Sequence, residues 1–382
     1  MTAGCGAHAV AVVWAQHAPY HVDRLTALAE AVGSGWRVTG IAEAPASAKY
    51  AWAAPAPGNG YHPVTLFRRP AERVRGLPRL RALARATRGH GHVFLCNYER
   101  PTTWLLALWL RARGTRVWLM FDSTRADKPR RAWHEALKRI ALAPYHGALV
   151  GGAASRAYLR ALGVRRRPVA TGYDTLAVAR VRREAATSPA PHGLPFERRG
   201  FLVVARCVPE KNLGAALDAY ARYAETAHRA GRAPRALWIC GDGPKRAALE
   251  AQARALGLAR CRFLGFRQPE GVARLLGHAL AVLLPSRSEP WGLAANEALA
   301  LGVPVLVSNR AGCAGDLVQD DTNGRVLDPA QPAAWADALC RLDRDRAAWQ
   351  RLAEGARDSA DAGDVRHFAA GAARLLGAAA AP

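Results

Sequence analysis

The sequence predicts an α/β protein with two doubly wound, parallel-sheet domains of the Rossmann type. The chain has 382 residues, which is too long for one ordinary core and suits two domains. Half of the residues are hydrophobic, so large cores can be buried. Short apolar, β-branched runs alternate with longer stretches rich in alanine and leucine. Near-continuous apolar strands are typical of parallel sheets that helices cover on both faces.

Individual elements follow from the apolar runs. In the first half we expect strands over 9–14, 36–41, 65–67, 93–96, 117–121, 148–150 and 168–171. In the second half we expect strands over 201–205, 236–240, 261–266, 281–284, 303–307 and 325–327. Helical patterns fill the gaps, for example 213–227 and 245–256, and an alanine-rich helix is expected over 367–380.

A segment with linker composition joins the halves, because prolines and charges occur there without any clear period. We therefore expect an N-terminal domain over 1–180, a linker over 181–199, a C-terminal domain over 200–360, and a terminal helix over 361–382 that packs back on the N-terminal domain.

The formal charge of +24 suggests a polyanionic partner. The excess lies in the first half, since residues 1–180 carry a net +18 and residues 200–382 a net +4. Arginine-rich and alanine-rich usage also arises from a biased codon pool. A basic nucleic-acid-binding protein is therefore the non-enzyme alternative, and it ranks low because no recognition motif or aromatic stacking pattern occurs.

Cysteine usage and hydropathy bear on localisation. The seven cysteines are scattered and form no CxxC pair, which favours a reducing compartment. No stretch approaches the ~20 apolar residues of a membrane span, and no basic residue precedes the apolar run 9–14 as in a signal peptide. We expect a cytoplasmic protein.

The most informative stretch is 286–305, where an apolar strand leads into a polar turn and then a helix over 293–301 that Gly302 ends. The start of such a helix lies at the carboxyl edge of a parallel sheet, where α/β folds bind ligands. The backbone N–H groups of Gly292 and Leu293, with the helix dipole, form an anion site. Gly292 has no side chain to obstruct a diphosphate.

Two carboxylates flank this anion site. Glu289 lies before the helix and Glu297 lies one turn inside it. A carboxylate only accepts hydrogen bonds, so Glu289 suits sugar hydroxyls next to the reacting carbon and Glu297 suits both ribose hydroxyls. The alternative makes Glu289 a turn residue and Glu297 a solvated helix residue.

Cations follow the strand 201–205 of the same domain. Arg206 and Lys211 lie at its carboxyl end, where two positive charges can bind a diphosphate and stabilise the charge that builds on a leaving group. The alternative is that both are solvated loop charges.

Two weaker motifs come next along the chain. The Gly-Asp-Gly-Pro segment 241–244 is a tight turn from strand to helix, and its role is mostly architectural. Phe266 and Arg267 end another strand and can frame a nucleotide base. Core packing is the alternative for Phe266.

In this order, these segments resemble the retaining glycosyltransferases of family four, which have the GT-B fold with two Rossmann-like domains facing a cleft. The resemblance covers about 198–345 and rests on the two cations, on 241–244, on 263–265, and on the glutamates around Gly292 and Leu293. It implies a nucleotide-diphosphate sugar donor, no metal or other cofactor, and transfer of a hexosyl-type sugar with retention to an unidentified acceptor. Trp291 and Asp316 depart from many relatives without touching the core motif.

The resemblance also implies residue roles. Arg206 and Lys211 would hold the diphosphate, Glu289 the sugar and Glu297 the ribose. The C-terminal domain would bind the nucleotide sugar, and the N-terminal domain would receive the acceptor. A nucleotide-sugar epimerase on the same fold is the enzymatic alternative.

The acceptor side is defined less sharply, because residues 16–24 stand where relatives often carry a glycine-rich loop after the first strand. His17 and His21 in this segment, and Asp122 after the strand 117–121, are candidates for contacting the transferred sugar or the acceptor hydroxyl. For the histidines, a polar cap and first helical turn is the alternative.

The segment 77–88 is basic and amphipathic, with three arginines on one helical face and Leu77, Leu80 and Ala84 on another. Together with the charge of the first half, it predicts an anionic acceptor or peripheral contact with anionic lipid on the inner membrane face. An ordinary solvated helix of the α/β layer is the alternative.

Overall fold

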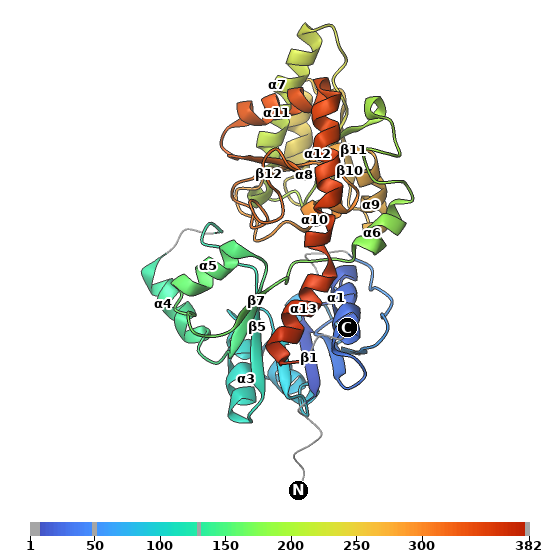
Figure 1. Cartoon of the computed structure of the whole chain (residues 1–382). Coiled ribbons are helices and arrows are strands. Elements are labelled where there is room, and N and C mark those ends of the chain that lie inside the picture. The colour runs from blue at the N-terminus through green and yellow to red at the C-terminus, as the bar shows by residue number, and fades with distance from the viewer. Residues whose placement is uncertain (1–7, 48–51, 128–130, 379–382) are drawn as a thin grey trace. The chain divides into compact units, whose positions relative to one another are not determined.

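The computed structural model describes residues 8–47, 52–127 and 131–378, and they form two compact units (Figure 1). The N-terminal unit contains the described residues up to Arg125, those from 131 to Leu176, and those from Val365 onward. The C-terminal unit spans Ala177–Asp364 and includes the short segment 126–127. The chain therefore enters the C-terminal unit after Leu176 and leaves it after Asp364, so the expected linker over 181–199 lies inside the C-terminal unit, and that unit begins before the expected start at 200.

The N-terminal unit is a seven-stranded parallel sheet in the order β3-β2-β1-β4-β5-β6-β7. Its strands are β1 (Ala9–Trp14), β2 (Arg37–Ala42), β3 (His62–Thr65), β4 (His92–Leu95), β5 (Arg116–Phe121), β6 (Gly147–Val150) and β7 (Val169–Thr171). Its helices are α1 (Pro19–Val32), η1 (Ala71–Arg73), α2 (Gly76–Ala86), α3 (Pro101–Ala112), α4 (Ala132–Ala141), α5 (Ala153–Ala161) and α13 (Val365–Leu376).

The C-terminal unit is a six-stranded parallel sheet in the order β10-β9-β8-β11-β12-β13. Its strands are β8 (Gly200–Val204), β9 (Leu237–Cys240), β10 (Cys261–Gly265), β11 (Ala279–Leu284), β12 (Val305–Ser308) and β13 (Gly324–Leu327). Its helices are α6 (Val178–Ala185), η2 (Phe196–Arg198), η3 (Pro209–Lys211), α7 (Leu213–Arg229), α8 (Arg246–Ala255), α9 (Pro269–Gly277), α10 (Leu293–Ala300), α11 (Pro332–Arg344), α12 (Arg346–Asp358) and η4 (Ala360–Gly363).

These two sheets confirm the predicted class of two doubly wound, parallel α/β domains. The least accurate strand prediction was 65–67, where the structure has β3 at His62–Thr65. This strand forms the edge of its sheet and is largely exposed, so it lacks the apolar run by which the buried strands are found.

The expected linker begins with a helix. In α6, the side chains of Val178, Val181 and Ala185 are buried, and Arg182 Nε donates to the Ala300 carbonyl at 2.8 Å. Three apolar positions at helical spacing thus lie between charged residues, and their side chains pack α6 against the rest of the C-terminal unit.

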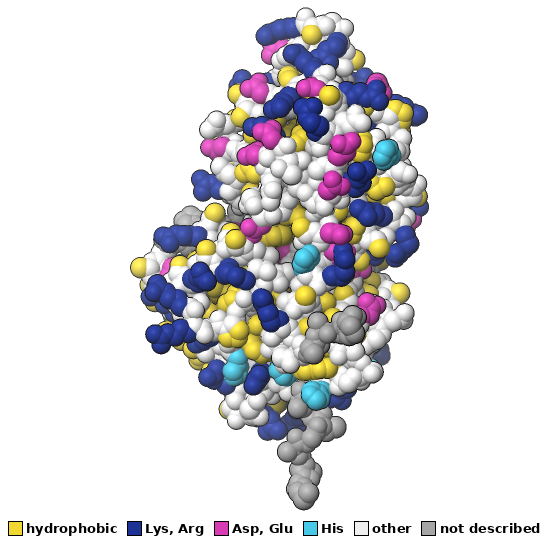
Figure 2. Space-filling view, in the orientation of Figure 1, with side chains coloured by type: hydrophobic (Ala, Val, Ile, Leu, Met, Phe, Trp, Pro, Cys, Tyr) yellow, Lys and Arg dark blue, Asp and Glu magenta, His cyan; other side chains and the backbone are white. Residues whose placement is uncertain are grey.

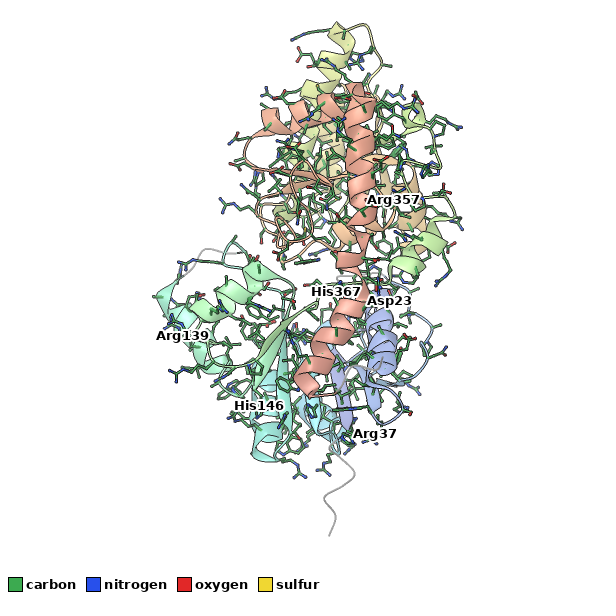
Figure 3. The ribbon with its side chains drawn as sticks, viewed as in Figure 1. Asp23, Arg37, Arg139, His146, Arg357 and His367 are labelled. Carbon is green, nitrogen blue, oxygen red and sulfur yellow. The ribbon has the colours of Figure 1, made fainter. Side chains whose placement is uncertain are left out.

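The C-terminal helix α13 belongs to the N-terminal unit, and Figure 1 shows it lying beside α1. Figure 3 marks the pair by Asp23 on α1 and His367 on α13. Arg24 of α1 is buried at their junction: its Nε donates to the Thr175 carbonyl at 2.9 Å, and its guanidinium lies 5.9 Å from the ring centre of Phe368. Arg24 is therefore a structural cation.

Helix α2 packs as a helix of the α/β layer, and the membrane contact expected for 77–88 stays a prediction. Leu83 is buried, and Leu80 and Ala84 pack on the core of the N-terminal unit. Arg79 is buried too and forms two hydrogen bonds of 2.6 Å with the Glu43 carboxylate. Apart from Leu77, which is exposed, the apolar side of α2 thus faces inward. Among the residues described, no helix has both the length and the apolar character that crossing a bilayer requires.

Candidate functional site

The C-terminal sheet has a topological switch point between β8 and β11. From β8 the chain builds outward through β9 and β10, and from β11 it builds in the opposite direction through β12 and β13. The loops after β8 and β11 therefore lie at the carboxyl edge on either side of a switch point, which is where α/β folds bind ligands. Lys211 follows β8 and Glu289 follows β11.

Lys211 and Glu289 meet at this switch point. Lys211 Nζ donates to Glu289 Oε2, and the two residues are 78 positions apart in the sequence. The side chains are 19% and 10% exposed, so the pair is largely withdrawn from water and still reachable. Ser286 Oγ lies 3.3 Å from the same carboxylate oxygen. Lys211 is therefore not a solvated loop cation, and Glu289 is not merely a turn residue.

Backbone and side-chain bonds hold the two loops together. The Arg287 N–H donates to the Glu210 carbonyl at 2.8 Å. Asn212 adopts a left-handed conformation at the start of α7, and its side-chain amide donates to the carbonyls of Pro285 and Pro329 at 3.1 Å each. Sequence reasoning missed Asn212 as a positioning residue, although an asparagine directly before a helix was a usable signal.

Gly292 starts α10 with a φ of 108°, which L side chains rarely adopt. A β-carbon there would lie 3.4 Å from Glu289 Cγ, so the turn packs closely on that carboxylate's side chain. The first N–H groups of a helix have no partners within it, so the N–H of Leu293 and its neighbours form a donor surface beside the pair. The Gly312 N–H donates to the Glu289 carbonyl at 2.9 Å and fixes this loop.

Trp291, a departure from many relatives, anchors the loop between β11 and α10. Its side chain is buried, and its indole N–H donates to Asn296 Oδ1 at 2.9 Å. The Asn296 amide in turn donates to the Gly363 carbonyl at 3.2 Å. Asp316, the other departure, is exposed.

Arg206 leaves β8 through a loop that interlocks with the Gly-Asp-Gly-Pro turn after β9. The Ala205 N–H donates to the Cys240 carbonyl at 3.0 Å, and the Cys207 N–H donates to the Asp242 carbonyl at 2.8 Å. Gly241 permits this contact, because a β-carbon there would lie 1.9 Å from the Ala205 carbonyl oxygen. The Gly-Asp-Gly-Pro turn is therefore architectural: it sets the position of the half-buried Arg206.

Glu297 is half-buried on α10, so the alternative of a fully solvated helix residue does not describe it. Burial raises the pKa of its carboxyl to about 7, Arg180 on α6 lowers this pKa, and Glu184 raises it. Burial also raises the pKa of the Cys240 thiol to about 11, with opposing influences from Arg267 and Glu297. Glu297 and Arg267 thus both lie close enough to Cys240, at the end of β9, to act on its charge.

Phe266 and Arg267 are both exposed, and Phe266 shows 38% of its surface to solvent. The core-packing alternative for Phe266 is therefore wrong. An exposed aromatic ring beside a cation remains suited to stacking against a nucleotide base, and that role stays a prediction.

Three cationic side chains follow strands at the carboxyl edge of the C-terminal sheet, namely Arg206, Lys211 and Arg267. Within the part of the chain that the structure describes, no three His, Cys, Asp or Glu side chains gather as a metal site requires.

The raised pKa of Glu297 predicts how the stability of the protein depends on pH. The raised folded-state pKa means that ionising this carboxyl costs stability, so its contribution is fully present below pH 4.5 and is lost as the pH rises toward 7. Glu297→Gln cannot ionise, and we expect it to be more stable than the wild type by about 1–2 kcal/mol at pH 8, with no difference at pH 4.5. The same variant should bind nucleotide more weakly, because the amide replaces a charged acceptor of ribose hydroxyls.

Urea unfolding at both pH values and nucleotide titration measure the two effects. Glu210→Gln, a change at an exposed carboxylate, is the matched control. Equal stability of Glu297→Gln and wild type at pH 8 would contradict the burial of this charge.

On the acceptor side, His21 fills the structural role that the alternative gave it. Its Nδ1 accepts the Ala18 N–H at 3.0 Å, and its ring stacks on Trp14 with centroids 4.4 Å apart. Burial, with Arg24 and His17 nearby, holds its pKa well below the usual range. His21 is therefore a neutral residue in the first turn of α1, and its contact with sugar or acceptor is not supported.

His17 and Asp122 remain better candidates than His21 for contacting the transferred sugar or the acceptor. Burial lowers the pKa of His17 to about 4, and its Nε2 is shielded without a hydrogen-bond partner, as are both amide atoms of Gln16. Asp122 is half-buried directly after β5, and its carbonyl accepts from Ser155 Oγ at 2.9 Å. Gln16 was not singled out in the sequence, and its position next to His17 was the only signal.

Comparison with known proteins points to one family. Residues 185–359 match the family model described as Glycosyl transferases group 1. The chain is 35% identical over 159 residues to the D-inositol 3-phosphate glycosyltransferase of Corynebacterium jeikeium, which covers 40% of this chain and 37% of that protein. It is 37% identical over 105 residues to the 2-deoxystreptamine N-acetyl-D-glucosaminyltransferase of Niallia circulans, covering 27% of each. The chain thus spans less than half the length of these relatives.

Solved structures resemble the whole chain. HepE from Anabaena, in complex with UDP and glucose, aligns with a TM-score of 0.71 and 15% identity over 97% of this chain and 100% of that one. Sucrose-phosphate synthase from Thermosynechococcus elongatus aligns with a TM-score of 0.70 and 19% identity over 96% of this chain and 98% of that one. At such identities the likeness concerns the fold.

Proposed function

We propose that this chain, whose residues 185–359 match the family model Glycosyl transferases group 1, transfers a hexosyl sugar from a nucleotide-diphosphate sugar to an acceptor hydroxyl. The transfer retains the configuration of the anomeric carbon and needs no metal ion.

The observation that supports this proposal is the pairing of Lys211 with Glu289 beside the first turn of α10. A cation that binds phosphate and a carboxylate that accepts from sugar hydroxyls are useful together where a sugar joins a diphosphate. In a donor, the sugar and the β-phosphate share one oxygen. A single Lys–Glu pair therefore reaches both sides of the bond that breaks.

The reaction balances without a further reactant. The acceptor oxygen forms a bond to the anomeric carbon, and the bond from that carbon to the β-phosphate oxygen breaks, its electron pair going to the phosphate. The acceptor proton passes to the departing diphosphate. Attack on the face from which the phosphate leaves gives retention. Arg206, Lys211 and the N–H groups at Leu293 stabilise the negative charge that grows on the diphosphate.

The test is a thermal-shift panel of nucleotide sugars, followed by product analysis with the sugar that stabilises most. UDP-glucose is the first probe, because a structure of HepE contains it. We expect stabilisation by one donor, and transfer to an acceptor with retained configuration in the presence of EDTA. Loss of activity in EDTA that magnesium restores would refute metal independence. An isomerised donor with no acceptor present would indicate an epimerase.

A further inference from the structure

Helix α4 is amphipathic, but its apolar side chains face solvent and its polar side chains face the protein. Three of its side chains, Trp133, Leu137 and Ile140, are 56%, 55% and 59% exposed. Their spacing of four and three residues places them on one face of the helix. No residue of α4 is buried. Among the described residues, this ten-residue helix carries three of the eight exposed large apolar side chains.

The opposite face of α4 attaches it to the N-terminal unit through polar groups. Tyr158 of α5 donates its hydroxyl to the Glu135 carboxylate at 2.9 Å, and Lys138 Nζ donates to the Tyr158 hydroxyl at 2.7 Å. Glu135 and Lys138 lie about half a turn away from the Trp133 stripe on a helix with 3.6 residues per turn. The helix is therefore held by its polar side and presents its apolar side to solvent, the reverse of α2.

The surroundings of this stripe are strongly basic. Residues 131–167 contain eight Lys and Arg side chains and one acidic residue, Glu135, which Lys138 and Tyr158 already bind. Arg131 directly before α4, Arg139 on α4 and Arg160 on α5 are exposed. Figure 2 shows Lys and Arg gathered over α4 and α5 with apolar side chains between them, and Figure 3 marks Arg139 on α4.

We propose that α4 docks the N-terminal unit on an anionic lipid surface, with Trp133, Leu137 and Ile140 inserted among the acyl chains and the flanking arginines at the headgroups. A helix with an apolar stripe and a basic border is what interfacial membrane binding requires. A second protein chain is a poorer occupant, because stable protein interfaces bury about 800 Å² per partner and their centres are depleted of charge. The stripe is one helix wide and bordered by arginine.

This inference does not depend on the proposed sugar transfer, and its test contains no nucleotide sugar. The intact protein is sedimented with vesicles of phosphatidylcholine, and separately with vesicles containing about one quarter phosphatidylglycerol. We expect binding to the anionic vesicles that weakens with salt. The triple variant Trp133→Ser, Leu137→Ser, Ile140→Ser should bind at least about tenfold more weakly. The double variant Arg131→Gln, Arg139→Gln should lose most of the preference for anionic lipid.

Leu77→Ser is the matched control, because Leu77 is 53% exposed on α2 of the same unit. It should bind like the wild type, and all variants should keep the wild-type melting temperature. Quenching of tryptophan fluorescence by brominated lipids should fall in Trp133→Phe. The proposal is overturned if the triple variant binds vesicles as well as the wild type, if Leu77→Ser loses binding instead, or if the wild type does not bind. It is also overturned if the triple variant only converts a dimer to a monomer.

Discussion

Glu289→Ala is expected to lower the rate of sugar transfer by about 10²–10³-fold while nucleotide binding changes little. The substitution removes the acceptor for sugar hydroxyls and leaves the Lys211 ammonium, which Glu289 binds in the structure, without its partner. An unpaired Lys211 still attracts the diphosphate of the nucleotide. The loss should therefore appear in kcat with the intact donor, and the affinity for the nucleoside diphosphate should be kept.

Two variants separate charge from architecture. Glu289→Gln keeps the shape and one acceptor oxygen but removes the charge, so an intermediate loss is expected. Glu210→Gln, at an exposed carboxylate of the neighbouring loop, should retain full activity. Near-wild-type transfer by Glu289→Ala would remove this residue from the mechanism. A parallel collapse of nucleotide binding would mean that Glu289 holds the loop and does not contact the sugar.

Gly241→Ala is expected to destabilise the protein by about 3 kcal/mol or more and to weaken donor binding. The new β-carbon would lie 1.9 Å from the Ala205 carbonyl oxygen, and the φ of 146° is one that alanine rarely adopts. The clash is with backbone, so relief requires the loop after β8 to move. That loop carries Arg206, and its displacement separates this cation from the rest of the site.

Gly231→Ala is the matched control in the same unit. Gly231 also has a positive φ, of 68°, but a β-carbon on this residue would meet no described atom within 4 Å. Only the conformational cost of about 1 kcal/mol should remain. Urea unfolding and donor titration of both variants measure the contrast. Equal losses in the two variants would show that backbone conformation, and not the contact with Ala205, makes Gly241 necessary.

Much of the fold follows from local sequence. The apolar runs locate the buried strands of both sheets to within a few residues, because a strand covered on both faces must be apolar along its length. The same reasoning fails at the exposed edge strand β3 and at α6, whose inward positions Val178, Val181 and Ala185 are separated by charged residues. It also leaves open the role of 77–88, because sequence alone does not say which face of a helix the core takes.

The candidate site divides in the same way. Residue types and spacing single out Lys211, Glu289 and Glu297, since turns after strands of a parallel sheet share one edge. The local sequence pattern does not predict the hydrogen bond between Lys211 and Glu289 or the burial that raises the pKa of Glu297. It also does not predict the hydrogen bond by which Asn212 holds the loop after β11. These depend on which strands become neighbours.

The sequence by itself determined the class of the fold and the resemblance of its second half to a glycosyltransferase family, because apolar periodicity and short motifs are properties of consecutive residues. Only the tertiary structure decided that β8 and β11 are adjacent, that His21 is a buried neutral residue, and that α4 exposes three large apolar side chains on one face. The physical reason is that burial and pairing are set by contacts between residues far apart in the chain.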